Sequence, residues 1–409
     1  MNWWRARAAT RWLVRSLLLS ARLRRPTMTG SPPTVSATNW MESFLLGLDE
    51  TALLKDRSRC LDVSTGEVAF RHTGGATLWP AGKFECISLG TLQERVAGSA
   101  APRRPLIPIC CVDGIDIGKA QAALTTEDKA MVQIASNFNA LEVPNREAYP
   151  DYGGLVTNYA VDTTQGPAAS FGVPAACLLR AHFPFYREGT EPASWGQTAR
   201  RQVELLSGVR EWFGTAVNGK VTLRGDEAPI GDGDEALIYV SDRIMLGLHA
   251  DAQVVFDRGP RAARSTDTQL TVLPASARPL VDQILSASVN VRSPGNVGRG
   301  APASEQLSKL VRACLRAAYR GAYLAAILRG RRKLLLTLIG GGIFANPLED
   351  ILDAIAAAHA DLAPISQLEE VRLCLYEPGS AKIIDAQLKA RLDKARPPSP
   401  RGKKRCGIS

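Results

Sequence analysis

The sequence of 409 residues predicts an α/β protein, and three observations support this class. Leu334–Ile339 is an apolar run of strand length, the pattern of a strand buried in a parallel sheet. A long amphipathic helix is predicted before it, over Glu305–Leu328. Glycines at 340–342 follow the strand, and a second amphipathic helix is predicted over Pro347–His359. Helices that alternate with apolar strands indicate a sheet covered by helices.

The triple-glycine turn is the first candidate binding element. Gly340, Gly341 and Gly342 carry no Cβ, so the turn can adopt positive φ and a ligand can approach its backbone. Pro347 suits the first turn of a helix, whose free N–H groups attract phosphate. The alternative is a tight strand-to-helix connection that holds no ligand.

The remaining elements are predicted from the same periodicities. Helices are expected over Trp40–Leu54, Leu89–Val96 and Gln197–Phe213. Strands are expected at Ile107–Val112, Lys129–Ser136, Gly219–Arg224, Ala236–Val240, Asp251–Asp257, Leu280–Val291 and Val371–Tyr376. The acidic stretch Gly225–Glu235 lacks the ligand spacing of a calcium loop and is interpreted as a solvated hairpin turn.

The net charge of +10 belongs to the two ends of the chain. Residues 1–27 carry seven arginines and no acids, and residues 389–409 carry a net charge of +7. Because each end contributes +7 to a total of +10, the body between them carries about −4. This distribution argues against a basic nucleic-acid groove across the fold.

The cysteine pattern argues against a metal site. The eight cysteines are scattered, without a C-x-x-C motif or a nearby pair of histidines. Neither a zinc site nor a disulfide framework is therefore expected, and no metal or cofactor is predicted.

Polar residues occur in two segments that are candidates for ligand contact. Asn137 and Asn139 come directly after the strand Lys129–Ser136, where ligands sit in open α/β sheets. The run from Val161 to Ser170 changes from polar to apolar and is interpreted as a loop that leads into a helix. In both places the alternative is structural, because Asn, Asp and Thr also cap loops and helices.

These features resemble the macrodomains, a family of ADP-ribose-binding proteins. The helix bearing Tyr319 and Tyr323, followed by LLLTLIGGGIFANPLEDILDAIAAAH, is similar to their final helix–strand–loop–helix. Val132–Asn139 is similar to the macrodomain strand that ends in an asparagine pair, and the resemblance covers Ile107–Tyr376. It implies a three-layer mixed sheet with helices on both faces, plus an N-terminal extension.

The sequence also departs from that family. Macrodomains usually place a glycine-rich phosphate loop after their asparagines, whereas FNALE and then DTTQGPAAS occupy the interval here. Residues 184–275 exceed what a minimal macrodomain needs. These differences indicate a divergent branch, nearer to the poly(ADP-ribose) glycohydrolase-like proteins.

The resemblance implies a binding site for ADP-ribose or an ADP-ribosylated macromolecule. Backbone N–H groups of Gly340–Asn346 and Thr164–Ala169 would hold the diphosphate. Asp116 would read the adenine, and Asn137 and Asn139 the distal ribose. Phe344 would stack on a ribose or base, or fill the core. The expected ligand-binding residues are Asp116, Asn137, Asn139, Thr164, Gly166, Gly340, Gly341, Gly342, Ile343, Phe344 and Asn346.

Hydrolysis of an ADP-ribosyl bond needs a carboxylate near the anomeric carbon. Glu142 and Asp162 are the acids that adjoin the candidate loops, so one of them is predicted as the acid/base and Gln165 as the residue that orients a water. The alternative is that both are structural surface carboxylates.

The two termini suggest conflicting destinations. Residues 1–27 are Arg-rich, acid-free and amphipathic, like an organellar (mitochondrial or plastid) transit peptide, or they are a leader that is not translated. Cys406 begins a C-terminal C-a-a-X pattern after Lys403–Arg405, which suggests prenylation and peripheral membrane contact from the cytoplasm, or else an unmodified tail.

The sequence therefore leaves three functions open. The first is an ADP-ribose-binding protein that hydrolyses the ADP-ribosyl bond. The second is a non-catalytic ADP-ribose or nucleotide module tethered to a membrane by its basic tail, and the third is a nucleotide-using enzyme on a Rossmann-like sheet. The expected organisation is a disordered or targeting-like extension (1–38), an N-terminal accessory segment (39–104), the macrodomain-like α/β domain (105–378) and a basic disordered tail (379–409).

Overall fold

A computed structural model describes residues 33–98, 102–144, 147–162, 164–257, 269–293, 296 and 304–395. The chain divides into two units, Met1–Pro33 and Thr34–Ser409. The elements described below all belong to the second unit. None of the described helices combines the length and apolar character that a membrane span requires.

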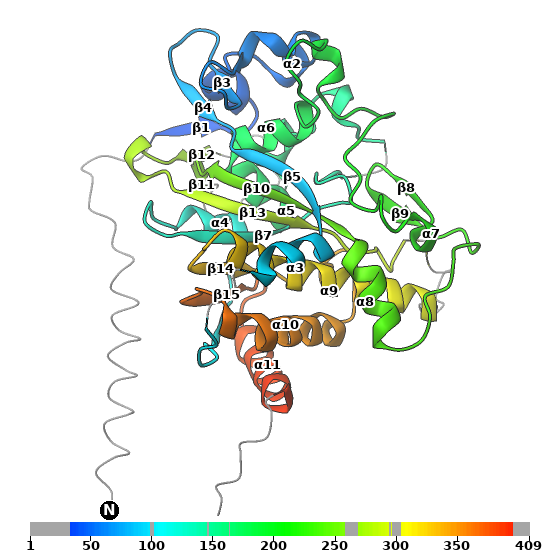
Figure 1. Cartoon of the computed structure of the whole chain (residues 1–409). Coiled ribbons are helices and arrows are strands. Elements are labelled where there is room, and N and C mark those ends of the chain that lie inside the picture. The colour runs from blue at the N-terminus through cyan, green and yellow to red at the C-terminus, as the bar shows by residue number, and fades with distance from the viewer. Residues whose placement is uncertain are drawn as a thin grey trace, which may run out of the picture. The chain divides into compact units, whose positions relative to one another are not determined.

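A seven-stranded mixed sheet organises the second unit (Figure 1). Its order is β5 (Lys83–Ser88), β10 (Met245–Gln253), β13 (Leu280–Ser286), β7 (Ala130–Ala135), β14 (Lys333–Leu336), β15 (Glu370–Cys374) and β6 (Ile109–Val112). The five strands from β13 to β6 are parallel to one another, and β10 is antiparallel to both of its neighbours. The parallel strands therefore all end at one edge, which we call the carboxyl edge.

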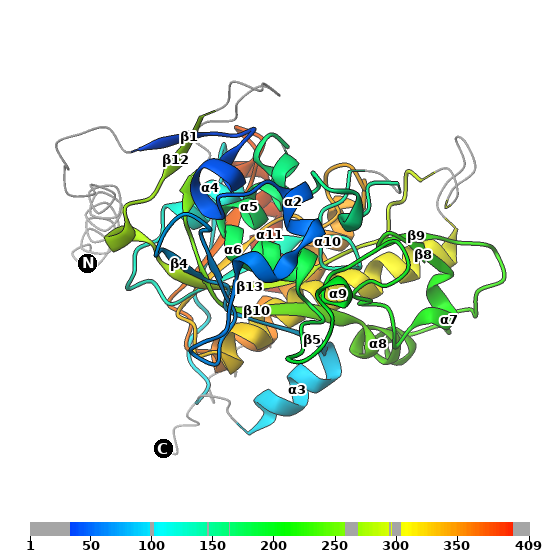
Figure 2. The same cartoon turned by 90° about the horizontal axis from the view of Figure 1, so that it is seen from above.

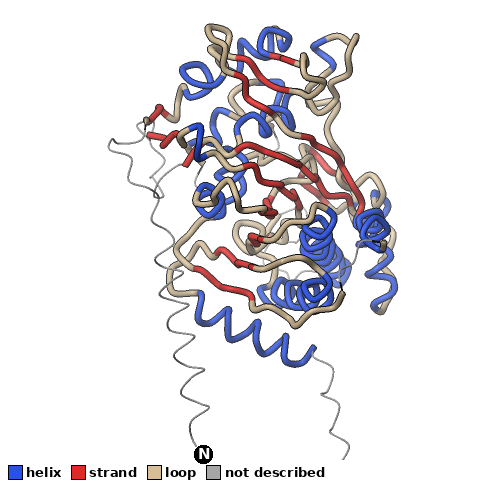
Figure 3. The backbone as a smooth tube through the Cα atoms, turned by 60° about the vertical axis from the view of Figure 1, so that its left-hand side comes forward, coloured by secondary structure: helices blue, strands red, loops and turns tan. Residues whose placement is uncertain are grey.

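Helices cover both faces of this sheet (Figure 3). On one face lies α9 (Glu305–Leu328), whose Ala318 carbonyl accepts a hydrogen bond of 3.1 Å from Gln133 Nε2 on β7. On the other face, Gln283 Nε2 on β13 donates to Gln121 Oε1 of α4 (Ile117–Ala122) over 2.8 Å. The predicted α/β class, with a mixed sheet between two helical layers, is confirmed.

The second unit contains further helices. They are α2 (Glu50–Lys55), α3 (Leu89–Ala97), α5 (Gln165–Gly172), α6 (Pro174–His182), α7 (Arg210–Phe213), α8 (Asp234–Arg243), α10 (Leu348–Leu362) and α11 (Ala381–Ala395). Smaller sheets are formed by β1 (Thr34–Ser36), β12 (Gln269–Val272) and β11 (Phe256–Asp257), by β2 (Leu61–Asp62), β3 (Ala69–Arg71) and β4 (Leu78–Pro80), and by the hairpin β8 (Thr215–Val217) and β9 (Lys220–Thr222).

The N-terminal segment is part of this body. Figure 2 shows α2 beside α6, where Glu50 Oε1 lies 2.9 Å from Nε2 of the buried His182. Trp40 packs edge-on against Phe171 and Phe256 in a second core of aromatic and aliphatic side chains. Because β5 pairs with β10, the segment before residue 105 contributes one edge strand to the main sheet.

Most predicted elements around the sheet are confirmed, including the helix Glu305–Leu328 and the strand–turn–helix that follows it. The strand predicted at Ala236–Val240 is wrong, because these residues lie within α8. Asp234 and Glu235 occupy the first turn of α8, where the helix dipole favours acidic side chains.

The helix predicted over Gln197–Phe213 is also wrong, since only Arg210–Phe213 is helical. The buried Gln197 bends this segment instead: its Nε2 donates to the Asn139 and Arg180 carbonyls, and its Oε1 accepts from Val203 N. The helix predicted over Trp40–Leu54 is observed as two pieces, a π-turn at Met41–Leu45 and α2. The chain breaks between them, where Gly47 has a φ of +72°. Between β10 and β11, residues 254–255 break the strand predicted at Asp251–Asp257.

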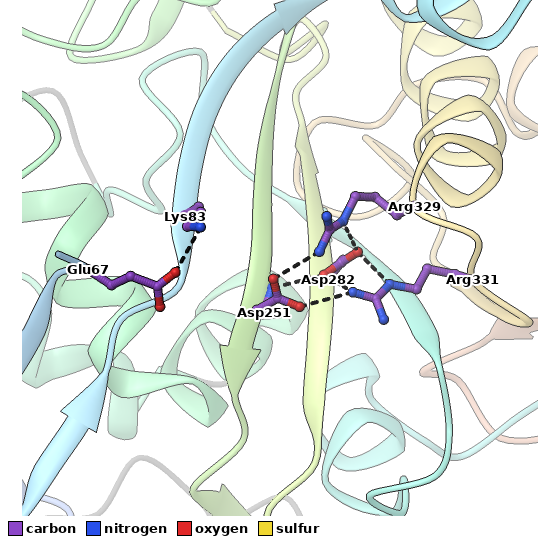
Figure 4. Close-up of polar contacts among 6 residues, drawn as sticks. All are labelled: Glu67, Lys83, Asp251, Asp282, Arg329 and Arg331. Carbon is purple, nitrogen blue, oxygen red and sulfur yellow. Dashed lines mark hydrogen bonds and ion pairs between the residues drawn. The ribbon is translucent and has the colours of Figure 1, made fainter. Parts of the chain in front are cut away.

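An ion cluster closes the amino end of β13 (Figure 4). Asp282 is fully buried, and its Oδ2 accepts from Arg329 Nε at 2.8 Å and Arg331 Nε at 2.6 Å. Its Oδ1 accepts from Arg331 Nη2 at 2.6 Å and from the backbone N of Asp251 at 2.9 Å. Asp251 also pairs with both arginines, so the cluster fixes the C-terminal end of α9 to the sheet.

Candidate functional site

The candidate site lies at the carboxyl edge of the parallel strands. The segment after β6 contains Asp116, the segment after β7 contains residues 136–142, and the segment after β14 contains residues 337–346. Parallel strands bring these loops together, because their carboxyl ends meet at one edge of the sheet. The helix α5 begins beside them.

Gln165, the first residue of α5, joins two of these loops. Its Oε1 accepts hydrogen bonds from Thr337 Oγ1 at 3.0 Å and from the backbone N of Ile117 at 3.3 Å. Thr337 opens the segment that contains the glycine turn, and Ile117 follows Asp116. The side chain predicted to orient a water thus also holds the start of α5 between two strand ends.

Glu142 lies against the first turn of α5. A Cβ on Gly166 would lie 2.3 Å from Glu142 Oε1 and 2.4 Å from the Ala135 carbonyl oxygen, so glycine leaves the space that the carboxyl group occupies. Burial raises the pKa of Glu142 well above its usual range, and the negative charge of Asp162 adds to this effect. The Oε1 atom is buried and has no hydrogen-bond partner. This environment therefore favours the protonated, neutral form of the Glu142 carboxyl group.

Asp162 has a different local role. Its Oδ1 accepts from the backbone N of Thr164 at 2.8 Å and from Thr164 Oγ1 at 2.5 Å. Thr164 is the N-cap residue of α5. Asp162 thus organises the entrance to α5, in agreement with the structural alternative for this residue, and its charge acts on Glu142 from there.

The glycine turn is folded around Asn346. Gly340 has a φ of +73°, and a Cβ there would lie 2.1 Å from Asn346 Oδ1. Asn346 donates from its backbone N to the Gly340 carbonyl at 2.9 Å and from Nδ2 to the Val289 carbonyl at 2.8 Å. Val291 N donates to the Phe344 carbonyl at 3.0 Å. Since β7 lies between β14 and β13, this loop crosses the carboxyl end of β7.

The tip of the same loop faces solvent. Gly341 and Gly342 are exposed, a Cβ on Gly342 would meet nothing within 4 Å, and Ile343 is 67% exposed. Phe344 is partly buried. The loop therefore combines a fixed base at Gly340 with an accessible backbone at its tip, which is the arrangement that a backbone-bound ligand needs.

The two asparagines after β7 differ in their environments. Asn139 is engaged in its own loop: Oδ1 accepts from Leu141 N at 3.2 Å, and Nδ2 donates to Asn218 Oδ1 at 3.2 Å. Asn137 is 3% exposed, and its Nδ2 has no partner. Asn139 therefore caps the loop, and Asn137 keeps an available buried donor at the carboxyl end of β7.

Asp116 caps α4. Its Oδ1 accepts from the backbone N of Lys119 at 2.7 Å, and the side chain is partly buried. This is a common role for aspartate at a helix N-terminus, and it leaves the second carboxylate oxygen for other contacts.

The sequence interpretation did not select Arg180, a buried arginine in α6. Its Nη1 donates to His249 Nδ1 at 3.1 Å and to Gln283 Oε1 at 3.2 Å, while Nε and Nη2 have no partner. Burial lowers the pKa of His249 to about 3, so the neutral ring accepts from the guanidinium. The available signal was that Arg180 and His182 are the polar residues of an otherwise apolar helix.

Several other polar atoms at the carboxyl edge have no hydrogen-bond partner. Buried polar groups in proteins are normally paired with protein or water, so unpaired ones indicate a place for water or ligand. The atoms are Glu142 Oε1, Asn137 Nδ2, Asn346 Oδ1, Ser286 Oγ and Ser288 Oγ. Ser286 is the last residue of β13 and Ser288 follows it by two residues, and neither was predicted as a site residue.

Neither a metal site nor the lipidation site can be placed here. Among the described residues no group of three or more His, Cys, Asp or Glu side chains is arranged to hold a metal ion. The described cysteines are free thiols. Cys406 lies outside the described residues, as does the N-terminal extension through residue 32.

Comparison with known proteins gives only distant structural similarity. No family model matches the chain, and no curated protein matches it. Poly(ADP-ribose) glycohydrolase from Deinococcus radiodurans in complex with ADP-ribose is 14% identical, covers 76% of this chain and 95% of its own, and has a TM-score of 0.37. The Thermomonospora curvata enzyme bound to the inhibitor ADP-HPD is 15% identical, covers 84% and 98%, and has a TM-score of 0.37. Because these identities and TM-scores are low, they do not establish a function for this chain.

Proposed function

We propose that the carboxyl edge binds ADP-ribose, or an ADP-ribosylated group, and hydrolyses the ADP-ribosyl bond, as expected for a divergent macrodomain-like protein. One observation carries this proposal: a partly enclosed carboxylic acid, Glu142, lies against the first turn of α5, while Gln165 in that turn holds the loops after β6 and β14. An acid, a helix N-terminus and a glycine turn are the groups that this chemistry requires.

The diphosphate would lie between the start of α5 and the tip of the glycine turn. Both offer backbone N–H groups, and a helix N-terminus favours anions. Gly341 and Gly342 are exposed, so phosphate oxygens can reach their backbone. Asn137 Nδ2, which has no protein partner, would donate to a ribose hydroxyl.

Glu142 would act as the general acid. In this step its proton passes to the oxygen that leaves the anomeric carbon, the glycosidic C–O bond breaks, and positive charge develops on the ribose ring. The resulting carboxylate then takes a proton from the water that adds to that carbon, which restores the acid. A raised pKa favours the first half of this cycle, because it favours the protonated form of Glu142. Gln165 would help to position the water, and Asp162 would contribute its charge while it holds Thr164 at the start of α5.

A second candidate is binding without hydrolysis. The observation that favours it is that Asp162 Oδ1 is engaged by Thr164, so Glu142 is the one predicted carboxyl group left for chemistry, whereas glycoside hydrolysis commonly uses two. The basic tail and Cys406 would then tether a binding module to a membrane, as the C-a-a-X pattern suggests.

Calorimetry with ADP-ribose tests the proposal, with NAD and AMP as competitors. Saturable binding of ADP-ribose in preference to both competitors is the expected result. Preferential binding of NAD or AMP would favour a Rossmann-like nucleotide enzyme, and no binding of any of the three would refute the site. Release of free ADP-ribose from an ADP-ribosylated protein, measured with the wild type and Glu142→Gln, then separates a hydrolase from a binding module.

A further inference from the structure

One buried tyrosine contacts both of the acids that were predicted at the candidate site. Tyr159 is 2% exposed and lies in a short 3₁₀ helix, Thr157–Ala160. Its OH accepts a hydrogen bond from the backbone N of Glu142 at 2.8 Å. Its carbonyl oxygen accepts from the backbone N of Asp162 at 3.3 Å. Tyr159 therefore joins the loop of Glu142 to the segment of Asp162 that leads into α5.

The hydrogen bond from Glu142 involves its main chain. Glu142 belongs to neither a helix nor a strand, so regular secondary structure does not hold its backbone N–H group. The phenol oxygen of Tyr159 supplies the acceptor instead. At the other end of the residue, the carboxyl group occupies the space that Gly166 leaves. The acid is therefore held at its backbone by one residue and enclosed at its carboxyl group by another.

The 3₁₀ helix that carries Tyr159 is itself fixed. Glu50, a buried residue of α2, accepts from Val156 N at 3.2 Å and from Thr157 N at 2.9 Å. Trp40 Nε1 donates to the Thr157 carbonyl at 3.2 Å. The Tyr159 ring packs in the second hydrophobic core. These contacts restrict the ring, so its hydroxyl gives the Glu142 backbone a fixed point of attachment.

The position of Glu142 matters for its proton. Burial is the main cause that raises the pKa of Glu142, and the negative charge of Asp162 adds to it. Lys220 on β9 and Arg180 on α6 also face this carboxyl group, and their positive charges act to lower its pKa. All of these effects depend on distance and on exclusion of water. Tyr159 bears on them because it contacts the backbone of both acids.

We propose that Tyr159 is a positioning residue for the acid: its hydroxyl and carbonyl oxygens hold Glu142 in a fixed place relative to Asp162 and the start of α5. This inference rests on the proposed function, because the Glu142 proton must be presented to the leaving oxygen of the ADP-ribosyl bond. Without the hydroxyl, the Glu142 backbone N loses its acceptor, and the acid can move toward water and away from Asp162.

Tyr159→Phe tests this role, because it keeps the ring and removes the acceptor. Single-turnover release of ADP-ribose from an ADP-ribosylated protein should slow by about 10- to 100-fold, since a small displacement of a catalytic group has this effect. The affinity for ADP-ribose, measured by calorimetry, should stay within about twofold of wild type. In the pH profile, the limb on which Glu142 loses its proton should move to lower pH, because a more hydrated acid ionises more easily.

A double-mutant cycle with Asp162→Asn tests the link between the two acids. Asp162→Asn removes a negative charge, so it should also move this limb of the profile to lower pH. The shift that Asp162→Asn causes should be smaller in the Tyr159→Phe background than in wild type, because Tyr159 holds the two acids together. Equal shifts in both backgrounds would contradict the link.

Tyr323→Phe is the matched control, because the hydroxyl of this fully buried tyrosine lies 2.7 Å from His359 Nδ1, between α9 and α10. It should leave the rate, the pH profile and the affinity unchanged, and circular dichroism would verify that each variant is folded. A Tyr159→Phe variant that matches wild type, or one that is slower without any change in the pH profile, would overturn the positioning role while the proposed function stands. A wild type that releases no ADP-ribose would instead overturn the proposed hydrolysis and this inference with it.

Discussion

The two ends of the same parallel strands are built in opposite ways. At the amino end of β13, the buried Asp282 is paired with Arg329 and Arg331 and also accepts the backbone N of Asp251 (Figure 4). At the carboxyl end of the same strand, the buried Ser286 hydroxyl has no partner. A charge is thus fully compensated at one end, while neutral polar groups lack partners at the other.

This difference distinguishes groups that stabilise the fold from groups that are available to bind a ligand. An unpaired buried charge would cost several kcal/mol, so the amino-end cluster must be complete for the fold to hold. An unpaired hydroxyl or amide costs less, roughly 1–3 kcal/mol, and this cost is recovered when a ligand or water supplies the missing partner. The carboxyl edge therefore has the properties of a site that is completed by what it binds.

The largest effect is expected at Glu142. Glu142→Gln keeps the shape of the side chain but removes its proton, so turnover should fall by about 10²- to 10⁴-fold while ADP-ribose affinity changes little. Single-turnover release of ADP-ribose measures the first and calorimetry the second. Unchanged turnover would assign the acid elsewhere and leave Glu142 as a structural residue.

Glu142→Gln should also change how the free energy of unfolding depends on pH. The folded state raises the pKa of Glu142, so this group stabilises the fold at pH values below its pKa in the unfolded chain. That contribution is lost as the pH rises toward the folded-state pKa. Urea unfolding should therefore show wild type losing stability relative to Glu142→Gln across this interval, and parallel curves would contradict the raised pKa.

Arg331→Met tests the amino-end cluster. The buried Asp282 would keep Arg329 but lose its pairing with Arg331, and the free energy of unfolding should fall by about 3 kcal/mol. Arg332→Met is the control, because Arg332 is an exposed neighbour whose ion pair with Glu369 spans 3.4 Å. It should cost less than about 1 kcal/mol in urea unfolding. Similar losses for both variants would remove the contrast between the two ends.

Gly340→Ala tests the base of the glycine turn. Its φ of +73° and the 2.1 Å approach of a Cβ to Asn346 Oδ1 predict a loss of about 1–3 kcal/mol in unfolding free energy and weakened ADP-ribose binding. Gly342→Ala has open space around the new Cβ and should leave stability nearly unchanged. Equal behaviour of the two variants would show that the turn is not held by Asn346.

The smallest effect is expected for Ser286→Ala. Removing a hydroxyl that has no partner should change the unfolding free energy by less than about 1 kcal/mol, in either direction. Ser366→Ala is the matched comparison, because the buried Ser366 Oγ donates to the Ala363 carbonyl at 2.8 Å and accepts from Leu368 N. It should cost about 1 kcal/mol more than Ser286→Ala, as measured by urea unfolding. A larger loss for Ser286→Ala would mean that a buried water pairs this hydroxyl.

The sequence predicted the parts of the fold that depend on local pattern. The strand–glycine–helix segment and the strand before Asn137 carry their signals in consecutive residues, so their positions were predicted correctly. Ala236–Val240 has the composition of a strand, but the acids before it and the exposure of Ile238 and Tyr239 place it on a surface helix. Local composition could not decide between those states.

The site could be predicted only in part, because its chemistry depends on contacts between distant residues. Glu142 was selected for its position in the sequence, yet its environment comes from the missing side chain of Gly166. The different roles of Asn137 and Asn139 depend on Asn218 in a hairpin far along the chain.

The hydrogen bond between Gln165 and Thr337 spans 172 residues of sequence. Loops that close over such separations form late in folding, because their entropy cost precedes the contacts that compensate it. During synthesis, α5 would leave the ribosome well before β14. Gln165 would therefore lack its hydrogen bond to Thr337 until β14 had been synthesised. A chain interrupted before Thr337 would therefore lack the glycine turn and leave the start of α5 without its second support.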